Sequence, residues 1–287
     1  MIVRRLSLYA DDSALFFSHR DPNVIANSLS NELSRCKHWL VDNRLSLHLG
    51  KTEVLLFGSK RRLKGVENFQ VFCDGTPIER KYNVKYLGVL LDENLNGNVH
   101  AGNLMKACAG RLSFLYRNSS FLDRKSRQTL CASLIQPHID YCCSSWYAGL
   151  TISLKKRLDV LQRKMVRFVY GLDPRAHVGN AELSRLAWLA VPDRVTFFCL
   201  AHLFKIKHKT APGYLNNDFT PVSSVHSHNT RASSQNFQLS RDLALSQNSF
   251  AFLAAKEWNK LPHDIKSLTD LRLFKKRLKL HLFSQYD

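Results

Sequence analysis

Proline, glycine and long apolar runs are scarce in this sequence, and each shortage excludes a class of protein. The chain has only 8 Pro and 12 Gly in 287 residues, which excludes collagen-like and low-complexity chains. Its most apolar stretch, residues 195–206, is interrupted by polar residues, so we expect no membrane-spanning helix, which would need about 20 apolar residues. The apolar start ends at Asp11 and Asp12, ahead of any signal-peptide cleavage site. We therefore expect an intracellular protein, nuclear or cytoplasmic, that is not secreted.

The cysteines also lack an informative pattern. There are 7 of them, an odd number, none forms a C-x-x-C pair, and Cys142 is adjacent to Cys143. This spacing favours neither a disulfide framework nor a zinc site. No Gly-rich phosphate-binding loop and no serine or cysteine nucleophile constellation occurs. We expect buried, reduced thiols and no organic cofactor.

Negative charge is the scarcest property of the chain. Only 23 Asp and Glu oppose 42 Lys and Arg, which gives a formal net charge of +19. Because 45% of the residues are hydrophobic, the chain can fold, and such a field attracts polyanions. Nucleic acid is the first partner that this composition indicates. An acidic membrane surface is the second, but no lipidation motif supports stable membrane association.

The order of hydrophobic patterns predicts an α+β fold. Short strand patterns at residues 6–9 and 14–17 flank an acidic turn, an amphipathic helix begins at Asp21-Pro22, and Asp74-Gly75 favours a hairpin. We expect a small antiparallel sheet with a covering helix, followed by a mainly α-helical region that includes a helix at 154–168. The expected parts are residues 1–96, a helical region 97–209, a linker 210–240 and a basic helical segment 241–287.

The acidic turn is the most informative motif. Two adjacent carboxylates, Asp11 and Asp12, on a turn between strands can supply the hard oxygen ligands that Mg²⁺ prefers, and Mg²⁺ assists phosphoryl transfer. An Asp-Asp dipeptide is more often a solvated turn. These residues alone leave both interpretations open.

Further motifs follow the acidic turn in a fixed order. Tyr-Ala-Asp-Asp at residues 9–12 precedes a Trp-Leu-x-x-Asn-x-Leu-x-Leu pattern that ends in Lys-Thr-Glu, at residues 39–53. Tyr-Leu-Gly follows at 86–88, and Trp-Asn-Lys-Leu-Pro at 258–262. This ordered set resembles the reverse transcriptases of non-LTR retrotransposons, in particular the jockey-like LINE elements. The resemblance implies the C-terminal part of a polymerase palm at 1–96, followed by thumb and connection regions.

The resemblance also implies roles for single residues. Asp11 and Asp12 would hold the catalytic metal, Mg²⁺ or Mn²⁺, once the full active site is completed. Lys51 would serve the pyrophosphate leaving group as a proton donor or as a neutralising cation; otherwise it is an ordinary surface lysine. The residues implied to contact the primer are Tyr9, Tyr86, Leu87 and Gly88.

Two basic helices are candidates for gripping a primer-template duplex of RNA and DNA. The first contributes Lys155, Lys156, Arg163, Lys164 and Arg167, and the second contributes Lys275, Lys276 and Arg277. Each helix could equally be a core helix with a solvated cationic face.

The family's fingers and another essential aspartate normally precede the Tyr-Ala-Asp-Asp turn, but only eight residues precede Tyr9 here. We therefore expect a truncated RNA-directed DNA polymerase that binds nucleic acid but is inactive alone, with an upstream palm and fingers polypeptide as partner. The alternatives are a host-retained basic scaffold or interaction protein without catalysis, and a working enzyme that is longer than this chain.

Overall fold

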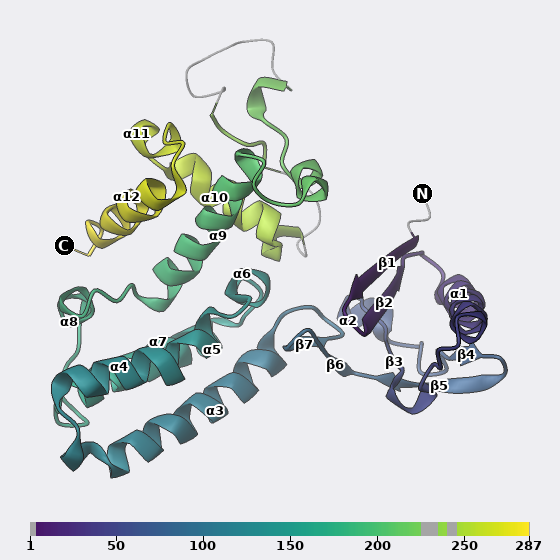
Figure 1. Ribbon diagram of the computed structural model, residues 1–287, viewed down its shortest axis with the longest axis horizontal. Coiled ribbons are helices and arrows are strands. Elements are labelled where there is room, and N and C mark those ends of the chain that lie inside the picture. The colour runs from purple at the N-terminus through teal and green to yellow at the C-terminus, as the bar shows by residue number, and fades with distance from the viewer. Residues whose placement is uncertain (1–3, 225–234, 240–245, 287) are drawn as a thin grey trace. The chain divides into compact units, whose positions relative to one another are not determined.

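The computed structural model describes residues 4–224, 235–239 and 246–286, and Figure 1 shows it as a ribbon. The chain divides into two compact units, Met1–His100 and Ala101–Asp287. All named strands lie in the first unit, and the second unit is built mainly of helices. The α+β character is therefore confirmed, whereas the boundaries of palm, thumb and linker remain predictions.

The first unit contains three small sheets in its described part. Its elements are β1 (Arg4–Tyr9), β2 (Asp12–Phe17), α1 (Pro22–Asp42), η1 (Leu49–Lys51), β3 (Glu53–Leu55), α2 (Lys60–Leu63), β4 (Val71–Cys73), β5 (Thr76–Lys81), β6 (Asn83–Tyr86) and β7 (Val89–Asp92). Strand β1 pairs with β2 and β6 with β7, while β5 lies between β3 and β4. The β3–β5 pair is parallel, so the expected single antiparallel sheet is wrong. The connection through α2 and β4 is long enough to let the chain return in the same direction.

Helix α1 covers the edge of the β3–β5–β4 sheet. It begins as expected, since the Asp21 side chain accepts a hydrogen bond from the Asn23 N–H at 2.9 Å. Two serine hydroxyls of α1 accept hydrogen bonds from the edge strand β4 and the turn after it. The Phe72 N–H donates to Ser30 Oγ at 2.9 Å, and the Asp74 N–H donates to Ser34 Oγ at 3.1 Å. These bonds satisfy backbone groups that an uncovered edge would leave open to pairing.

A single hydrophobic cluster joins the helix and the sheet of the first unit. Its buried members are Leu33, Leu56, Phe69, Val71, Cys73 and Ile78. Leu15 of β2 packs against this cluster, and so do Leu49 and Val54 on either side of Lys51. The core therefore fixes the acidic hairpin and the lysine segment within one folding unit.

Helix α9 lies at the centre of the second unit. The helices, the first of which begins just before this unit, are α3 (Asn98–Arg117), α4 (Arg124–Leu134), α5 (Gln136–Asp140), α6 (Cys143–Trp146), α7 (Ile152–Tyr170), α8 (Asn180–Arg185), α9 (Val191–Lys207), α10 (Phe250–Lys260), α11 (His263–Lys266) and α12 (Leu271–Phe283). Helix α9 contacts α5, α6, α7, α10 and α12. Arg194 near its start forms a bidentate ion pair with Asp140 of α5, which fixes the angle between two helices as well as their contact.

The Trp-Asn-Lys-Leu-Pro block has a structural role in the second unit. Trp258 is fully buried, and its indole N–H donates to the Gln235 carbonyl at 2.9 Å. The Asn259 amide holds Phe237 from both sides, accepting from its N–H at 2.9 Å and donating to its carbonyl at 2.7 Å. The block therefore fastens residues 235–239 to α10.

The cysteines are unpaired, as expected, but not all of them are buried. Cys36 is half-buried, and Cys142 is exposed in a left-handed backbone conformation, with φ of 49°. Burial raises the pKa of Cys131, Cys143 and Cys199 to about 12, so these thiols stay protonated at neutral pH. No helix in the described part of the chain is long and apolar enough to cross a membrane.

Replacing Asn259 by Ala should release residues 235–239. The change leaves the Phe237 N–H and carbonyl without partners, so we expect a loss of about 1–3 kcal/mol in unfolding free energy. Thermal unfolding and hydrogen exchange at the Phe237 amide measure the effect. Asn217→Ala, at an exposed position, is the control; equal behaviour of the two variants would contradict the clamp.

His100 should make the first unit sensitive to acid. Its Nδ1 accepts a hydrogen bond from the Leu90 N–H at 3.2 Å, and burial lowers its pKa from the ordinary 6.5. The unfolded chain therefore protonates His100 more readily than the folded chain does. The contribution of neutral His100 to the free energy of unfolding is complete above pH 6.5, and it is lost as the pH falls through the lower pKa of the folded state.

We expect exchange of the Leu90 amide to accelerate as the pH falls below 6.5, after correction for intrinsic exchange rates. His100→Asn keeps an acceptor but removes the titration, and should flatten this profile. His263→Asn, at an exposed site, should not. A profile that keeps its slope in His100→Asn would refute the assignment.

Candidate active-site hairpin and nucleic-acid interface

The Tyr-Ala-Asp-Asp motif forms the two-residue turn of the β1–β2 hairpin. Tyr9 lies opposite Asp12 at the end of the antiparallel ladder, so Ala10 and Asp11 make the loop. Ala10 has φ of 51°, in the left-handed region that favours glycine at the first position of such turns. A residue with a Cβ costs about 1–2 kcal/mol there, and the strain lies next to the two carboxylates.

Asp11 and Asp12 are both exposed. No hydrogen bond or ion pair joins either carboxylate to the side chains that the structure describes. Carboxylate oxygens suit Mg²⁺, which proteins usually bind through one or two carboxylates together with water and substrate phosphates. Among the described residues, no group of three or more His, Cys, Asp or Glu could hold a metal ion. The donor chemistry therefore fits one divalent cation, whereas a pair of metal ions would need further ligands.

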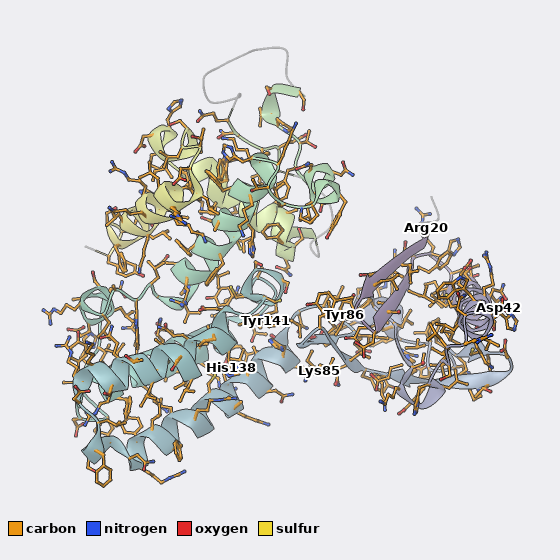
Figure 2. All side chains as sticks on the ribbon, viewed as in Figure 1. Arg20, Asp42, Lys85, Tyr86, His138 and Tyr141 are labelled. Carbon is orange, nitrogen blue, oxygen red and sulfur yellow. The ribbon has the colours of Figure 1, made fainter. Side chains whose placement is uncertain are left out.

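Tyr86 contacts the β1–β2 hairpin on the face that carries Tyr9 and Asp12. Directly opposite residues of an antiparallel pair have their side chains on the same face of the sheet, and successive residues along a strand point to opposite faces. By the β1–β2 register, Ser7, Phe16 and Asp12 lie on this shared face. The Tyr86 hydroxyl donates to Ser7 Oγ at 3.1 Å, and its ring meets Phe16 edge to face, with centroids 6.5 Å apart. Figure 2 labels Tyr86 beside this hairpin.

The Tyr-Leu-Gly motif is a second strained two-residue turn. Tyr86 pairs with Val89, which leaves Leu87 and Gly88 as the loop, with φ of 44° and 82°. Two successive positive φ values define the turn that fits the twist of a hairpin. Glycine adopts this conformation freely, whereas leucine does not.

Lys51 ends η1 and is exposed. The residues beside it share the core of the first unit with β2, but no described contact joins its ammonium group to Asp11 or Asp12. The structure therefore brings Tyr86 onto the hairpin, whereas Lys51 is connected to it only through the common core.

Several of the expected phosphate-binding residues of α7 are engaged within the protein. Lys155 donates to the Ala148 carbonyl at 3.0 Å, and burial lowers its pKa. Arg163 pairs with Asp159 at 2.8 Å and also donates to a backbone carbonyl. Arg167 Nε donates to the Ala176 carbonyl at 2.8 Å. These three side chains fasten α7 to neighbouring segments.

The other cations of α7 face solvent. Lys156 and Lys164 are exposed, and so is Arg157, which was not among the residues expected at the interface. All three line a groove of about 690 Å³ between α3 and α7. The Asp159–Arg163 pair has i,i+4 spacing, which is a local sequence signal. The bonds of Lys155 and Arg167 depend on the paths of the segments directly before and after α7, which spacing does not record.

The basic residues of α12 are divided in the same way. Lys276 and Arg277 are exposed, whereas Lys275 is half-buried. Lys279 lies over the Phe283 ring, 5.7 Å from its centroid. Helix α12 therefore offers a smaller cationic surface than its composition indicates.

Comparison with known proteins finds relatives among polymerases of mobile elements. A probable RNA-directed DNA polymerase from transposon X-element of Drosophila melanogaster is 25% identical over 172 residues. The RNA-directed DNA polymerase from mobile element jockey of Drosophila funebris is 26% identical over 172 residues. A probable RNA-directed DNA polymerase from transposon BS of Drosophila melanogaster is 28% identical over 174 residues.

The alignments cover 57% to 58% of this chain, and the chain spans 18% of the length of each of these relatives. No family model and no solved structure matches the chain.

Replacing Ala10 by Gly should stabilise the β1–β2 hairpin. The relief of strain exceeds the added entropy of the unfolded chain, so we expect a gain of roughly 0.5–1 kcal/mol. Hydrogen exchange of the β1 and β2 amides reports the opening free energy. Ala107→Gly, at an exposed position within α3, should instead destabilise its own helix by about 1 kcal/mol, read from the α3 amides. Destabilisation by both changes would argue against a strained turn.

Proposed function

We propose that this chain is part of an RNA-directed DNA polymerase of a non-LTR element. Its homologues are RNA-directed DNA polymerases of Drosophila non-LTR elements. They confirm the resemblance that the motifs of the chain indicate. Its first unit would carry the metal-binding turn and the primer-contacting hairpin of the palm. The observation that carries this proposal is the contact of Tyr86 with Ser7, which joins the Tyr-Leu-Gly motif to the hairpin that carries the Tyr-Ala-Asp-Asp turn, across 79 positions of the sequence.

In this proposal Asp11 and Asp12 hold a divalent cation through their carboxylate oxygens. The metal would supply charge stabilisation to a transferring phosphoryl group. Tyr9, whose side chain is exposed on the Asp12 side of the hairpin, would lie under the primer end. Lys51 would offer a positive charge to the pyrophosphate leaving group.

The ligand set makes this chain a poor catalyst by itself. A two-metal site needs ligands on both sides of the ion pair, and Asp11 and Asp12 supply only one adjacent pair. We propose that a further carboxylate belongs to another segment of the full polymerase. The 287 residues alone would then bind nucleic acid without extending a primer.

The second unit would supply the nucleic-acid contacts. The support is the exposed position of Lys156, Arg157 and Lys164 along α7, together with Lys276 and Arg277 on α12. A basic scaffold without catalysis, the alternative considered above, has no observation in its favour among the relatives.

Binding of the purified chain to a fluorescent RNA/DNA primer-template, across a salt series, tests the proposal. With about four phosphate contacts, affinity should fall roughly 10²-fold between 50 and 200 mM salt. Addition of Mg²⁺ and nucleotides should give no extension. Extension that Asp11→Ala abolishes would overturn the claim of inactivity and keep the polymerase assignment. Absence of salt-sensitive binding would overturn the nucleic-acid role.

Metal binding by the turn can be tested separately. Mn²⁺ should broaden the NMR signals of Asp11 and Asp12 first, because the two carboxylates share one ion. Asp11→Asn combined with Asp12→Asn should abolish this broadening. Asp42→Asn, which removes an exposed carboxylate at the end of α1, should leave it unchanged. Equal broadening in the double variant would exclude the turn as a metal site.

A further inference from the structure

The second unit contains a groove with apolar walls and a cationic rim. Helices α3 and α7, neighbours in Figure 1, form it. Its lining includes buried Met105, Leu112 and Leu161, and also Val160, which is 42% exposed. Tyr116, which is 38% exposed, also lines the groove, so the open apolar surface here is continuous and bordered by polar groups, the arrangement found at interaction sites.

The groove stays open because small side chains line the α3 wall. Ala109 and Ser113 are exposed there and are too short to fill the space. Near one end, Tyr116 bridges the two helices: its hydroxyl donates to the Lys164 carbonyl at 3.2 Å, and its ring packs on Phe168. The bridge holds the helices apart at a fixed spacing.

The charge along this groove has one sign. Lys156, Arg157, Lys164 and Arg167 line it, and no Asp or Glu does among the described residues. Arg167 is tied down by its bond to a backbone carbonyl, but the other three cations are exposed. Asp159, the acidic residue of α7, is paired with Arg163 instead. The lining therefore suits a ligand that is anionic and also presents apolar surface.

We propose that this groove binds single-stranded nucleic acid, with bases against Val160 and Tyr116 and phosphates against the exposed cations. A duplex could meet the cations, but its bases are stacked inside and would leave the apolar wall uncovered. An unpaired strand offers both surfaces at once, and every base has a face that packs on apolar or aromatic side chains. This inference rests on the proposed function and names the form of nucleic acid that the second unit takes.

The length of the groove suits a short strand. Lys156 and Lys164 are two turns apart on α7, about 12 Å at 1.5 Å per residue. This distance corresponds to roughly three to four stacked nucleotides at 3.4 Å each. Base packing in this mode tolerates any sequence, so binding is expected to show little sequence preference.

The test compares single strands with a duplex. The full chain is titrated with labelled unstructured RNA and DNA strands of about 12 nucleotides and with an RNA/DNA duplex of the same length, several times the span of the groove. Lys156→Gln combined with Lys164→Gln, and separately Val160→Asp, should weaken single-strand binding about ten-fold. Val160→Asp should change duplex binding less than about two-fold. The double lysine variant should weaken duplex binding as well, because duplex phosphates also meet these cations, but by a smaller factor than single-strand binding. Lys125→Gln combined with Lys256→Gln removes equal charge from exposed sites outside the groove and should leave single-strand binding within about two-fold.

A direct probe complements these variants. Val160→Trp adds a ring at a half-exposed site, so folding should be kept, and base packing should quench its fluorescence with single strands but not with duplex. Equal losses for strand and duplex would overturn the single-strand assignment and keep nucleic-acid binding. If neither ligand binds the unmodified chain, the proposed function itself fails. If an acidic peptide or phosphatidylserine vesicles alone produce the quench, the groove serves another partner and the inference is wrong.

Discussion

The contact between Tyr86 and the β1–β2 hairpin is the constraint on which the candidate active site depends. A two-stranded ribbon is marginally stable by itself, and Leu15 anchors this one to the core from one face only. Tyr86 covers the other face through Ser7 and Phe16. Two segments with no local relation in the sequence thereby fix the face from which Asp12 and Tyr9 project.

Both hairpins of this site place a side-chain-bearing residue where glycine would be relaxed. Ala10 and Leu87 have positive φ values in two-residue turns, and each turn coincides with a motif of the family. Such strain persists only where the surroundings over-determine the conformation. In the first unit those surroundings are the antiparallel ladders on either side of each turn, together with the Tyr86 contact.

In the second unit, the same kind of residue performs two tasks. Lys155, Arg163 and Arg167 satisfy backbone carbonyls and stabilise the attachment of α7. Lys156, Arg157 and Lys164 bear the charge that faces solvent. A chain of net charge +19 thus uses part of its positive charge in folding, and another part is concentrated beside an apolar groove.

The sequence by itself determined the local elements. The Asp21 cap, the Asp74-Gly75 hairpin, the buried stripe of α7 and the acidic turn depend on neighbours within a few residues, so spacing and turn chemistry are sufficient to find them. The resemblance to polymerases of mobile elements likewise depends on the order of short motifs.

Only the tertiary structure decided which residues meet. The parallel β3–β5 pair and the Tyr86–Ser7 bond join segments that are far apart in the chain. The division of the α7 cations depends on where the segments flanking α7 place their backbone carbonyls. The Trp-Asn-Lys-Leu-Pro block, which resembled a family signature, is also a clamp on residues 235–239. Hydrophobic periodicity records which side of an element is buried, but it does not record what that side is buried against.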